Sequence, residues 1–344
     1  MAWLHIFKNG LFIAILAHSL IGVSLVWDKV LLKEPQTKNL VSYVFWLGFI
    51  SVFGLCLIPF GYNYPGHAIA GLAFGTGIVH LVANYLYYAA LKKGEASETL
   101  AMMGGFSPVL TALIGIPLLT QPIGKGNVLG FFLMVSGGFV MFFSEKLALK
   151  RVLFWVFSAS ATFGLVNVLE KVVFNATNFV SGYVYFTIGT FVGSLLLLLR
   201  PEWRRQIFEH SEEASPRSKT LYMINRFMAG VGSFLIFFAI SLQSPAVVDA
   251  ITGVRYVLIF LGAYLLTRLR PQWLCENFTG WTLVGKSVAT ALVVAGLIFL
   301  GLTGGNTSQN ASNTTPHATT QAPSQRCHVT RSPSKYFASI VSRM

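Results

Sequence analysis

The chain has 344 residues, of which 54% are hydrophobic and 11% are charged. A soluble globular domain carries about 25% charged residues, so this composition excludes an ordinary soluble protein and predicts that most of the chain lies in a membrane. The net charge is +13, but the basic residues flank apolar segments, where they indicate topology and contact with anionic lipid headgroups. We therefore expect membrane lipids, and not nucleic acid, as partners.

Apolar segments long enough to cross a hydrocarbon core of about 30 Å recur along the chain. Long continuous apolar runs are typical of helices and differ from the alternating pattern of a membrane barrel. The sequence therefore predicts an all-α, multi-pass integral membrane protein with about ten transmembrane helices, which we expect in the cytoplasmic membrane. The predicted spans are 10–27, 40–60, 67–91, 99–119, 128–144, 152–169, 179–199, 221–242, 246–266 and 280–302.

An internal repeat divides these spans into two sets of five. Residues 21–31 and 163–173 both contain a glycine, five further residues, an acid, a lysine and two aliphatic residues. Because five is an odd number, the second set begins on the opposite side of the membrane, and the two sets are inverted relative to each other. We predict two inverted five-helix repeats, residues 10–144 and 152–303. The polar segment 304–344 is too poor in apolar residues to fold and is expected to be a disordered tail.

Three features of the spans are shared with a known family. Lys29 and Lys171 close the first helix of each half, residues 106–113 contain a Ser-Pro-Val motif in the fourth span, and residues 130–138 form a glycine-containing fifth span. In these features the sequence resembles the drug/metabolite transporter superfamily, in particular its EamA-like ten-helix members. It departs from the family pattern at residues 61–66, where a basic cluster is absent. The resemblance implies a transporter and does not specify the substrate.

The loops that follow odd-numbered spans carry fifteen lysine and arginine residues, against three near the spans on the other side. By the positive-inside rule, the basic loops are cytoplasmic and both termini are outside. The family resemblance implies the reverse orientation. We base our prediction on the charge asymmetry because it acts on this chain directly.

The ninth span contains an arginine near its middle. Arg255 lies about nine residues into the span, some 14 Å deep at about 1.5 Å per residue, and Asp249, Thr252 and Tyr256 share its face of the predicted helix. A charged side chain at this depth is a candidate functional residue. The functional interpretation is a cavity wall that binds an anionic or zwitterionic group through Arg255. The alternative is an internal ion pair of Arg255 with Asp249 or Glu98 that fixes packing.

A second polar face occurs on the third span. His80, Asn84, Tyr87 and Tyr88 recur at helical spacing, which is consistent with either a cavity wall or a hydrogen-bonded packing cluster. Arg226 lies near the start of the eighth span, where it can snorkel to the membrane surface.

Several other residues have simpler interpretations. Lys29 and Lys171 either bind a ligand or, as we expect, anchor helix ends. Tyr43 and Tyr183 either stack on a substrate or, as we expect, lie in the interfacial aromatic belt. The small-residue motifs 71–75 and 189–193 permit close helix approach. We expect them to pack within the chain, although a homodimer is possible.

The sequence contains no zinc-protease, serine-hydrolase or nucleotide-binding motif. We therefore expect no catalytic residue, no metal and no cofactor. The leading hypothesis is a secondary transporter or facilitator of a small organic solute, which is metabolite-like, amino-acid-like or drug-like. The alternatives are a membrane-embedded enzyme and a non-transporting scaffold or sensor.

Overall fold

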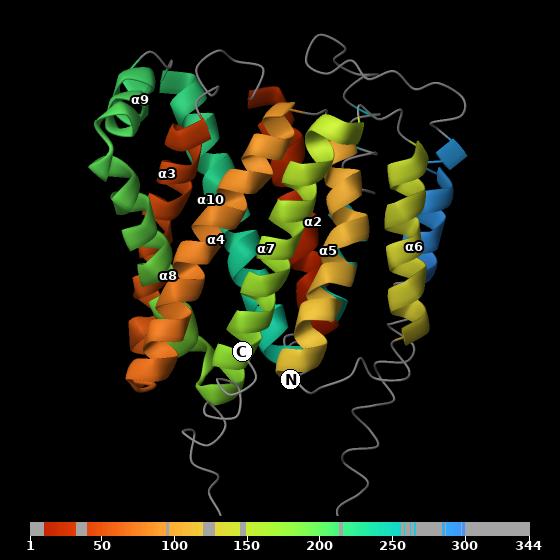
Figure 1. Ribbon diagram of the computed structural model, residues 1–344, viewed down its shortest axis with the longest axis horizontal. Coiled ribbons are helices and arrows are strands. Elements are labelled where there is room, and N and C mark those ends of the chain that lie inside the picture. The colour runs from red at the N-terminus through yellow and green to blue at the C-terminus, as the bar shows by residue number, and fades with distance from the viewer. Residues whose placement is uncertain are drawn as a thin grey trace, which may run out of the picture.

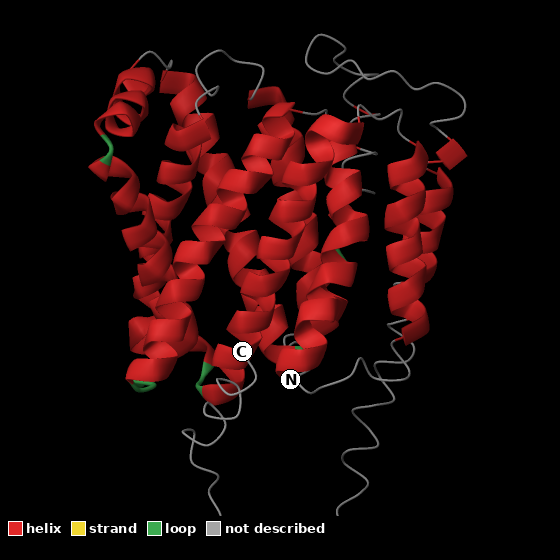
Figure 2. Cartoon of the chain, viewed as in Figure 1, coloured by secondary structure: helices red, strands yellow, loops and turns green. Residues whose placement is uncertain are grey.

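The structure is a computed structural model that describes residues 10–31, 40–93, 96–119, 128–144, 149–212 and 216–255, with isolated positions and one short helix beyond them. The described residues are mostly helical, with short loops and turns, and contain no β-strand (Figure 2). The first six elements are α2 (Gly10–Leu31), α3 (Leu40–Ile50), η2 (Ser51–Phe60), α4 (His67–Lys93), α5 (Ala96–Leu119) and α6 (Val128–Ser144). The next six are α7 (Leu149–Ala176), α8 (Phe179–Leu196), η4 (Leu197–Leu199), α9 (Pro201–Glu212), α10 (Pro216–Leu242) and α11 (Pro245–Ala250).

The long helices run side by side (Figure 1). Six helical segments of the described chain are long and apolar enough to cross a membrane, and three more are apolar but shorter. These segments overlap nine of the predicted spans, and α11 begins the remaining one, at 246–266. The multi-pass helical prediction is therefore confirmed. The inverted repeat and the predicted tail remain predictions, and the tail lies outside the described residues.

One element, α9, was not predicted as a helix, because the segment after the seventh span is short and rich in charged residues. Pro201 occupies the first position and Glu202 the first turn, both of which favour a helix start. The helix is amphipathic: Ile207 is fully buried, while Arg204 is exposed. It lies against α3 at one end of the bundle (Figure 1), where the rings of Phe208 and Phe45 are 6.3 Å apart.

Helix α7 continues seven residues beyond the expected end of the sixth span, from Leu169 to Ala176. The apolar residues after Lys171 extend the run that a membrane helix requires. Lys171 is buried, and its ammonium donates a hydrogen bond to the Ser241 carbonyl oxygen at 3.0 Å. The expectation that Lys171 is a simple helix-end anchor is therefore wrong. Lys29 has no described side chain.

Helices α4 and α8 approach each other through glycines. A Cβ atom added to Gly189 would lie 1.9 Å from the Phe74 carbonyl oxygen, and one added to Gly77 would lie 2.1 Å from the Phe186 carbonyl oxygen. Residues 189–193 thus pack within the chain. A Cβ added to Gly71 or Gly75 would meet no atom within 4 Å, so this second small-residue motif has an open face among the described residues.

Helices from the two predicted halves also pack on each other. Gly232 of α10 lies against α2, where an added Cβ would be 2.6 Å from an Ile21 side-chain atom. Gly164 of α7 lies against α5, where an added Cβ would be 2.9 Å from the Thr111 hydroxyl oxygen. Because contacts of this kind join early and late segments of the chain, the polar residues of distant spans are brought to one interior region.

Candidate functional site

The ninth predicted span is interrupted where its polar residues lie. Helix α11 ends at Ala250, residues 251 and 252 form a turn, and helix resumes at residues 253–255. The Thr252 N–H donates to the Asp249 carbonyl oxygen at 3.0 Å, and the Arg255 N–H donates to the Thr252 carbonyl oxygen at 2.9 Å. These bonds span three residues instead of the four of an α-helix. Interrupted helices of this kind form substrate sites in many transporters.

The interruption directs one backbone carbonyl to another helix. In a continuous α-helix the Val248 carbonyl oxygen would accept from the Thr252 N–H. Here the Nε2 atom of His18, on α2, lies 2.9 Å from that oxygen. Because a carbonyl oxygen can only accept, His18 must carry its proton on Nε2 in this contact. His18 is buried and was not identified from the sequence.

Asp249 lies at the centre of a buried polar cluster. Its Oδ1 atom accepts a hydrogen bond from the Asn167 amide nitrogen at 2.8 Å, and its Oδ2 atom accepts one from the Thr111 hydroxyl. Asp249 also interacts electrostatically with Arg255. The carboxylate is therefore held by groups from α5 and α7 as well as by its own span, which a reading of one helix could not predict.

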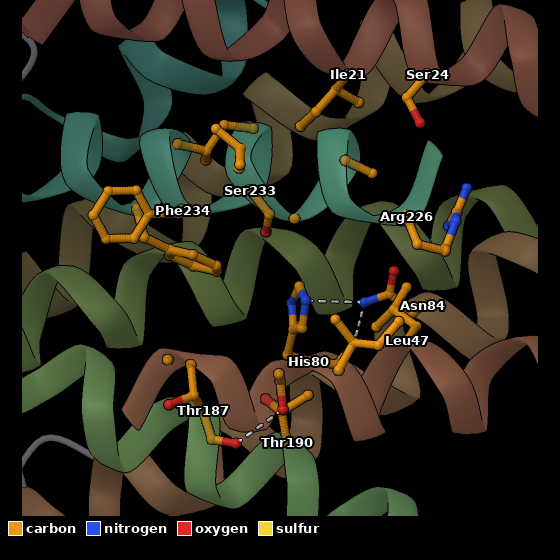
Figure 3. A pocket seen from close by; sticks show the side chains of 18 of the residues that line it. Ile21, Ser24, Leu47, His80, Asn84, Thr187, Thr190, Arg226, Ser233 and Phe234 are labelled. Carbon is orange, nitrogen blue, oxygen red and sulfur yellow. Dashed lines mark hydrogen bonds between the residues drawn. The ribbon is translucent and has the colours of Figure 1, made fainter. Parts of the chain in front are cut away.

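The polar face of the third predicted span lies on α4 and points to the same interior region. The Asn84 amide nitrogen lies 3.0 Å from His80 Nε2 and donates to the His80 carbonyl oxygen at 2.8 Å (Figure 3). The His80 ring lies among aromatic rings, with Phe186 at 5.1 Å and Phe237 at 5.7 Å between centroids. This pair is a rigid polar group in an aromatic wall.

Arg226 of α10 is buried and does not snorkel. One terminal nitrogen donates to the Tyr88 hydroxyl at 2.9 Å, and the guanidinium lies 4.6 Å from the centre of the Tyr43 ring. Contact with an aromatic face stabilises a cation away from water. Tyr43 and Tyr183 are also buried, so the expectation that they belong to an interfacial belt is wrong.

Many of these groups line one cavity of about 480 Å³, a size typical of small-molecule sites. Six of the predicted site residues lie on its wall: His80, Asn84, Tyr88, Asp249, Thr252 and Arg255. Tyr256 and the side chain of Glu98 lie outside the described residues. The wall also includes Asn167, Thr187, Thr190 and Arg226, which were not predicted as site residues. Asn167 could have been found as an amide inside the sixth span.

The charge of the described wall is unbalanced. Two arginines, Arg226 and Arg255, face one acidic residue, Asp249. Around them the wall is mainly apolar and aromatic, with Phe163, Phe186 and other rings. A cavity of this kind is suited to a solute with an acidic group and an apolar body.

Comparison with known proteins bears on what such a cavity does. Residues 8–143 match the EamA-like transporter family. The resemblance to this family is therefore confirmed over that region, which is less than half of the chain. One solved crystal structure superposes on 86% of this chain and 96% of its own chain, with a TM-score of 0.56 at 15% identity, which shows a shared fold alone. None of the curated proteins matches this chain.

Proposed function

We propose that the protein is a secondary transporter or facilitator of a small anionic or zwitterionic organic solute. The solute binds in the cavity, and Arg255 contacts its acidic group. Access alternates between the two sides of the membrane as residues 10–144 and 152–303 move relative to each other. The cavity supports this proposal because its wall is formed by both segments, with His80 from the first and Arg255 from the second. A site between two halves is the arrangement that alternating access requires.

The chemistry of the wall favours an acidic group as the bound feature. The guanidinium is planar and presents paired donors that match a carboxylate or phosphate. Asp249, the nearby acid, already accepts hydrogen bonds from Asn167 and Thr111. The two arginines exceed the one aspartate on the described wall, so a bound anion or zwitterion would balance the charge. The family match favours transport over the enzyme and scaffold alternatives.

The proposal is tested by uptake into vesicles that contain the purified protein, with a panel of labelled amino acids and organic acids. We expect at least one acidic or zwitterionic solute to enter faster than in empty vesicles. Arg255→Lys should reduce this uptake about 10- to 100-fold, because a charge-assisted hydrogen bond of about 1.5–3 kcal/mol is lost. Arg204→Lys is the matched control, since Arg204 is exposed on α9.

The alternative role of Arg255, an internal ion pair, predicts a different pattern. Removing both charges would then relieve the defect of removing one, because an uncompensated buried charge is what destabilises the protein. We therefore compare Arg255→Leu with the double variant Arg255→Leu, Asp249→Leu, after size-exclusion chromatography shows that both are folded. Restored uptake in the double variant would exclude a solute-binding role for Arg255.

A further inference from the structure

A second acidic residue lies in the interior of the bundle, beside the cavity. Glu170 is fully buried on α7 and lies six residues before the end of the helix. At about 1.5 Å per residue, it is about 9 Å from that end along the helix axis. Among the described residues, neither of its carboxyl oxygens has a hydrogen-bond partner. An ionised carboxylate without partners is strongly unfavourable in such a place, whereas a protonated carboxyl is tolerated.

Glu170 shares a helix face with residues of the cavity wall. Phe163 and Asn167 line the cavity, and Glu170 follows them at positions seven and three residues later. At about 100° per residue these three side chains lie on the same side of α7. Glu170 is thus one turn beyond Asn167, the residue that donates to Asp249. It is close to the solute site without being part of the described wall.

Helices α7 and α8 approach each other one turn beyond Glu170. Gly182 permits close approach of the two helices, because an added Cβ would lie 2.7 Å from a Val173 methyl group. The next residue, Tyr183, lines the cavity and is close enough to Glu170 for an electrostatic interaction.

The charged groups around Glu170 are engaged elsewhere. Lys171, on the same helix, donates to the Ser241 carbonyl oxygen on α10. Asp249 on α11 accepts from Asn167 and Thr111. On the other helices packed against α7, His80 of α4 bonds to Asn84 and Arg226 of α10 bonds to Tyr88. On α8, the buried Tyr183 is close enough to Glu170 for an electrostatic interaction.

We propose that Glu170 is a proton-binding site that couples proton uptake and release to the opening of the cavity. The carboxyl holds a proton in the present arrangement, with α8 packed against α7. When the helices separate, water reaches the carboxyl and accepts the proton, and Glu170 becomes a hydrated carboxylate. Rebinding of the proton permits the helices to close. This inference rests on the proposed alternating access and adds a proton as the coupled ion.

The first test asks whether Glu170 is protonated, and it requires no solute. The infrared spectrum of the protein in lipid should show the C=O stretching band of a protonated carboxyl at neutral pH, where exposed acids are ionised. Glu170→Gln should remove this band, while Asp249→Asn should leave it in place. Absence of the band in the wild type, or its persistence in Glu170→Gln, would overturn the proposal.

The second test asks whether the proton controls the cavity. Cys56 is an exposed free thiol on the cavity wall, and replacing Cys275 and Cys327 by serine leaves it as the reporter. The labelling rate with a methanethiosulfonate reagent is measured against pH in this background with Glu170 and with Glu170→Gln. Ionisation of the Cys56 thiol affects both proteins, so the ratio of their rates isolates the effect of Glu170.

We expect this ratio to be close to one at acid pH, because glutamine resembles the protonated carboxyl. As pH rises, Glu170 loses its proton and the cavity opens, so Cys56 should be labelled faster, and the ratio of the rate with Glu170 to the rate with Glu170→Gln should rise by up to about tenfold per pH unit. Glu170→Asp, which retains an acid, should keep a pH-dependent ratio. A ratio that is constant with pH would refute the coupling. Neither measurement depends on the solute panel, so a failed uptake screen would count against the proposed function alone.

Discussion

The contact between α4 and α8 provides a quantitative prediction with an internal control. In Gly189→Ala, the added Cβ would lie 1.9 Å from the Phe74 carbonyl oxygen. An ordinary contact between carbon and oxygen is about 3.3 Å, so α8 would have to move away from α4 by about 1.4 Å. The same movement would stretch the hydrogen bond from the Thr190 hydroxyl to the Gly77 carbonyl oxygen, which is 3.1 Å long.

The expected loss of stability is the sum of two effects. Overpacking a well-packed interface costs about 1–3 kcal/mol, and loss of the Thr190 hydrogen bond costs about 0.5–1.5 kcal/mol. Gly189→Ala should therefore lower the free energy of unfolding by about 1.5–4.5 kcal/mol. Gly71→Ala is the control, because its added Cβ meets no atom within 4 Å and alanine favours a helix.

Denaturation in mild detergent, followed by circular dichroism, measures both variants. We expect Gly71→Ala to be as stable as the wild type or slightly more stable. If Gly189→Ala were no less stable than Gly71→Ala, the close packing of α4 on α8 would be refuted. Size-exclusion chromatography of Gly71→Ala also tests the possible homodimer, because a dimer that used this open face would dissociate.

Three further predictions concern the site and the topology. Asn167→Leu removes the amide that donates to Asp249 and should destabilise the protein by about 1.5–3 kcal/mol. An unchanged unfolding midpoint would argue against this contact. His18→Phe leaves the Val248 carbonyl oxygen without its donor and should lower the free energy of unfolding by about 1–3 kcal/mol. His18→Gln can still donate a hydrogen bond, so its loss of stability should be smaller. Equal melting temperatures for the two variants would contradict the assigned role of His18. A reporter fused at Gly304 should be active on the extracytoplasmic side, and activity in the cytoplasm would reverse the predicted orientation.

The helices of the bundle could be predicted because the membrane imposes a simple requirement on the sequence. A span needs an apolar run of sufficient length, so the start of α4 at His67 and of α8 at Phe179 coincides with the predicted start of each run. The same criterion could not detect α9, which is short and amphipathic and lies among charged residues. It also ended the sixth span too early, because Glu170 and Lys171 read as polar boundary residues although both are buried.

The cavity was only partly accessible to sequence reasoning. Arg255 and His80 could be identified because an ionisable residue within an apolar run is conspicuous. Arg226 was misjudged because depth in the membrane was inferred from distance to the end of the span. Its actual environment is set by Tyr43 and Tyr88, which belong to other helices. Partners that are far apart in the sequence are determined by packing, and the spacing within one helix carries no information about them.

The interruption of the ninth span had a signal in the sequence, although the span was treated as one continuous helix. Pro245 lies at the start of α11 and Gly253 directly follows the turn, and glycine or proline within a short apolar segment is typical of discontinuous transporter helices. Gly253 is required by packing, because an added Cβ would lie 2.7 Å from a Val293 methyl group. Because of the interruption, the Val248 carbonyl oxygen accepts a hydrogen bond from His18 and not from its own helix. The polar face of this span therefore depends on a residue of the first span. A site built in this way joins the first and ninth spans, and displacement of α2 would be transmitted to Asp249 and Arg255 through the His18 hydrogen bond and through the packing of Gly22 on the Arg255 backbone.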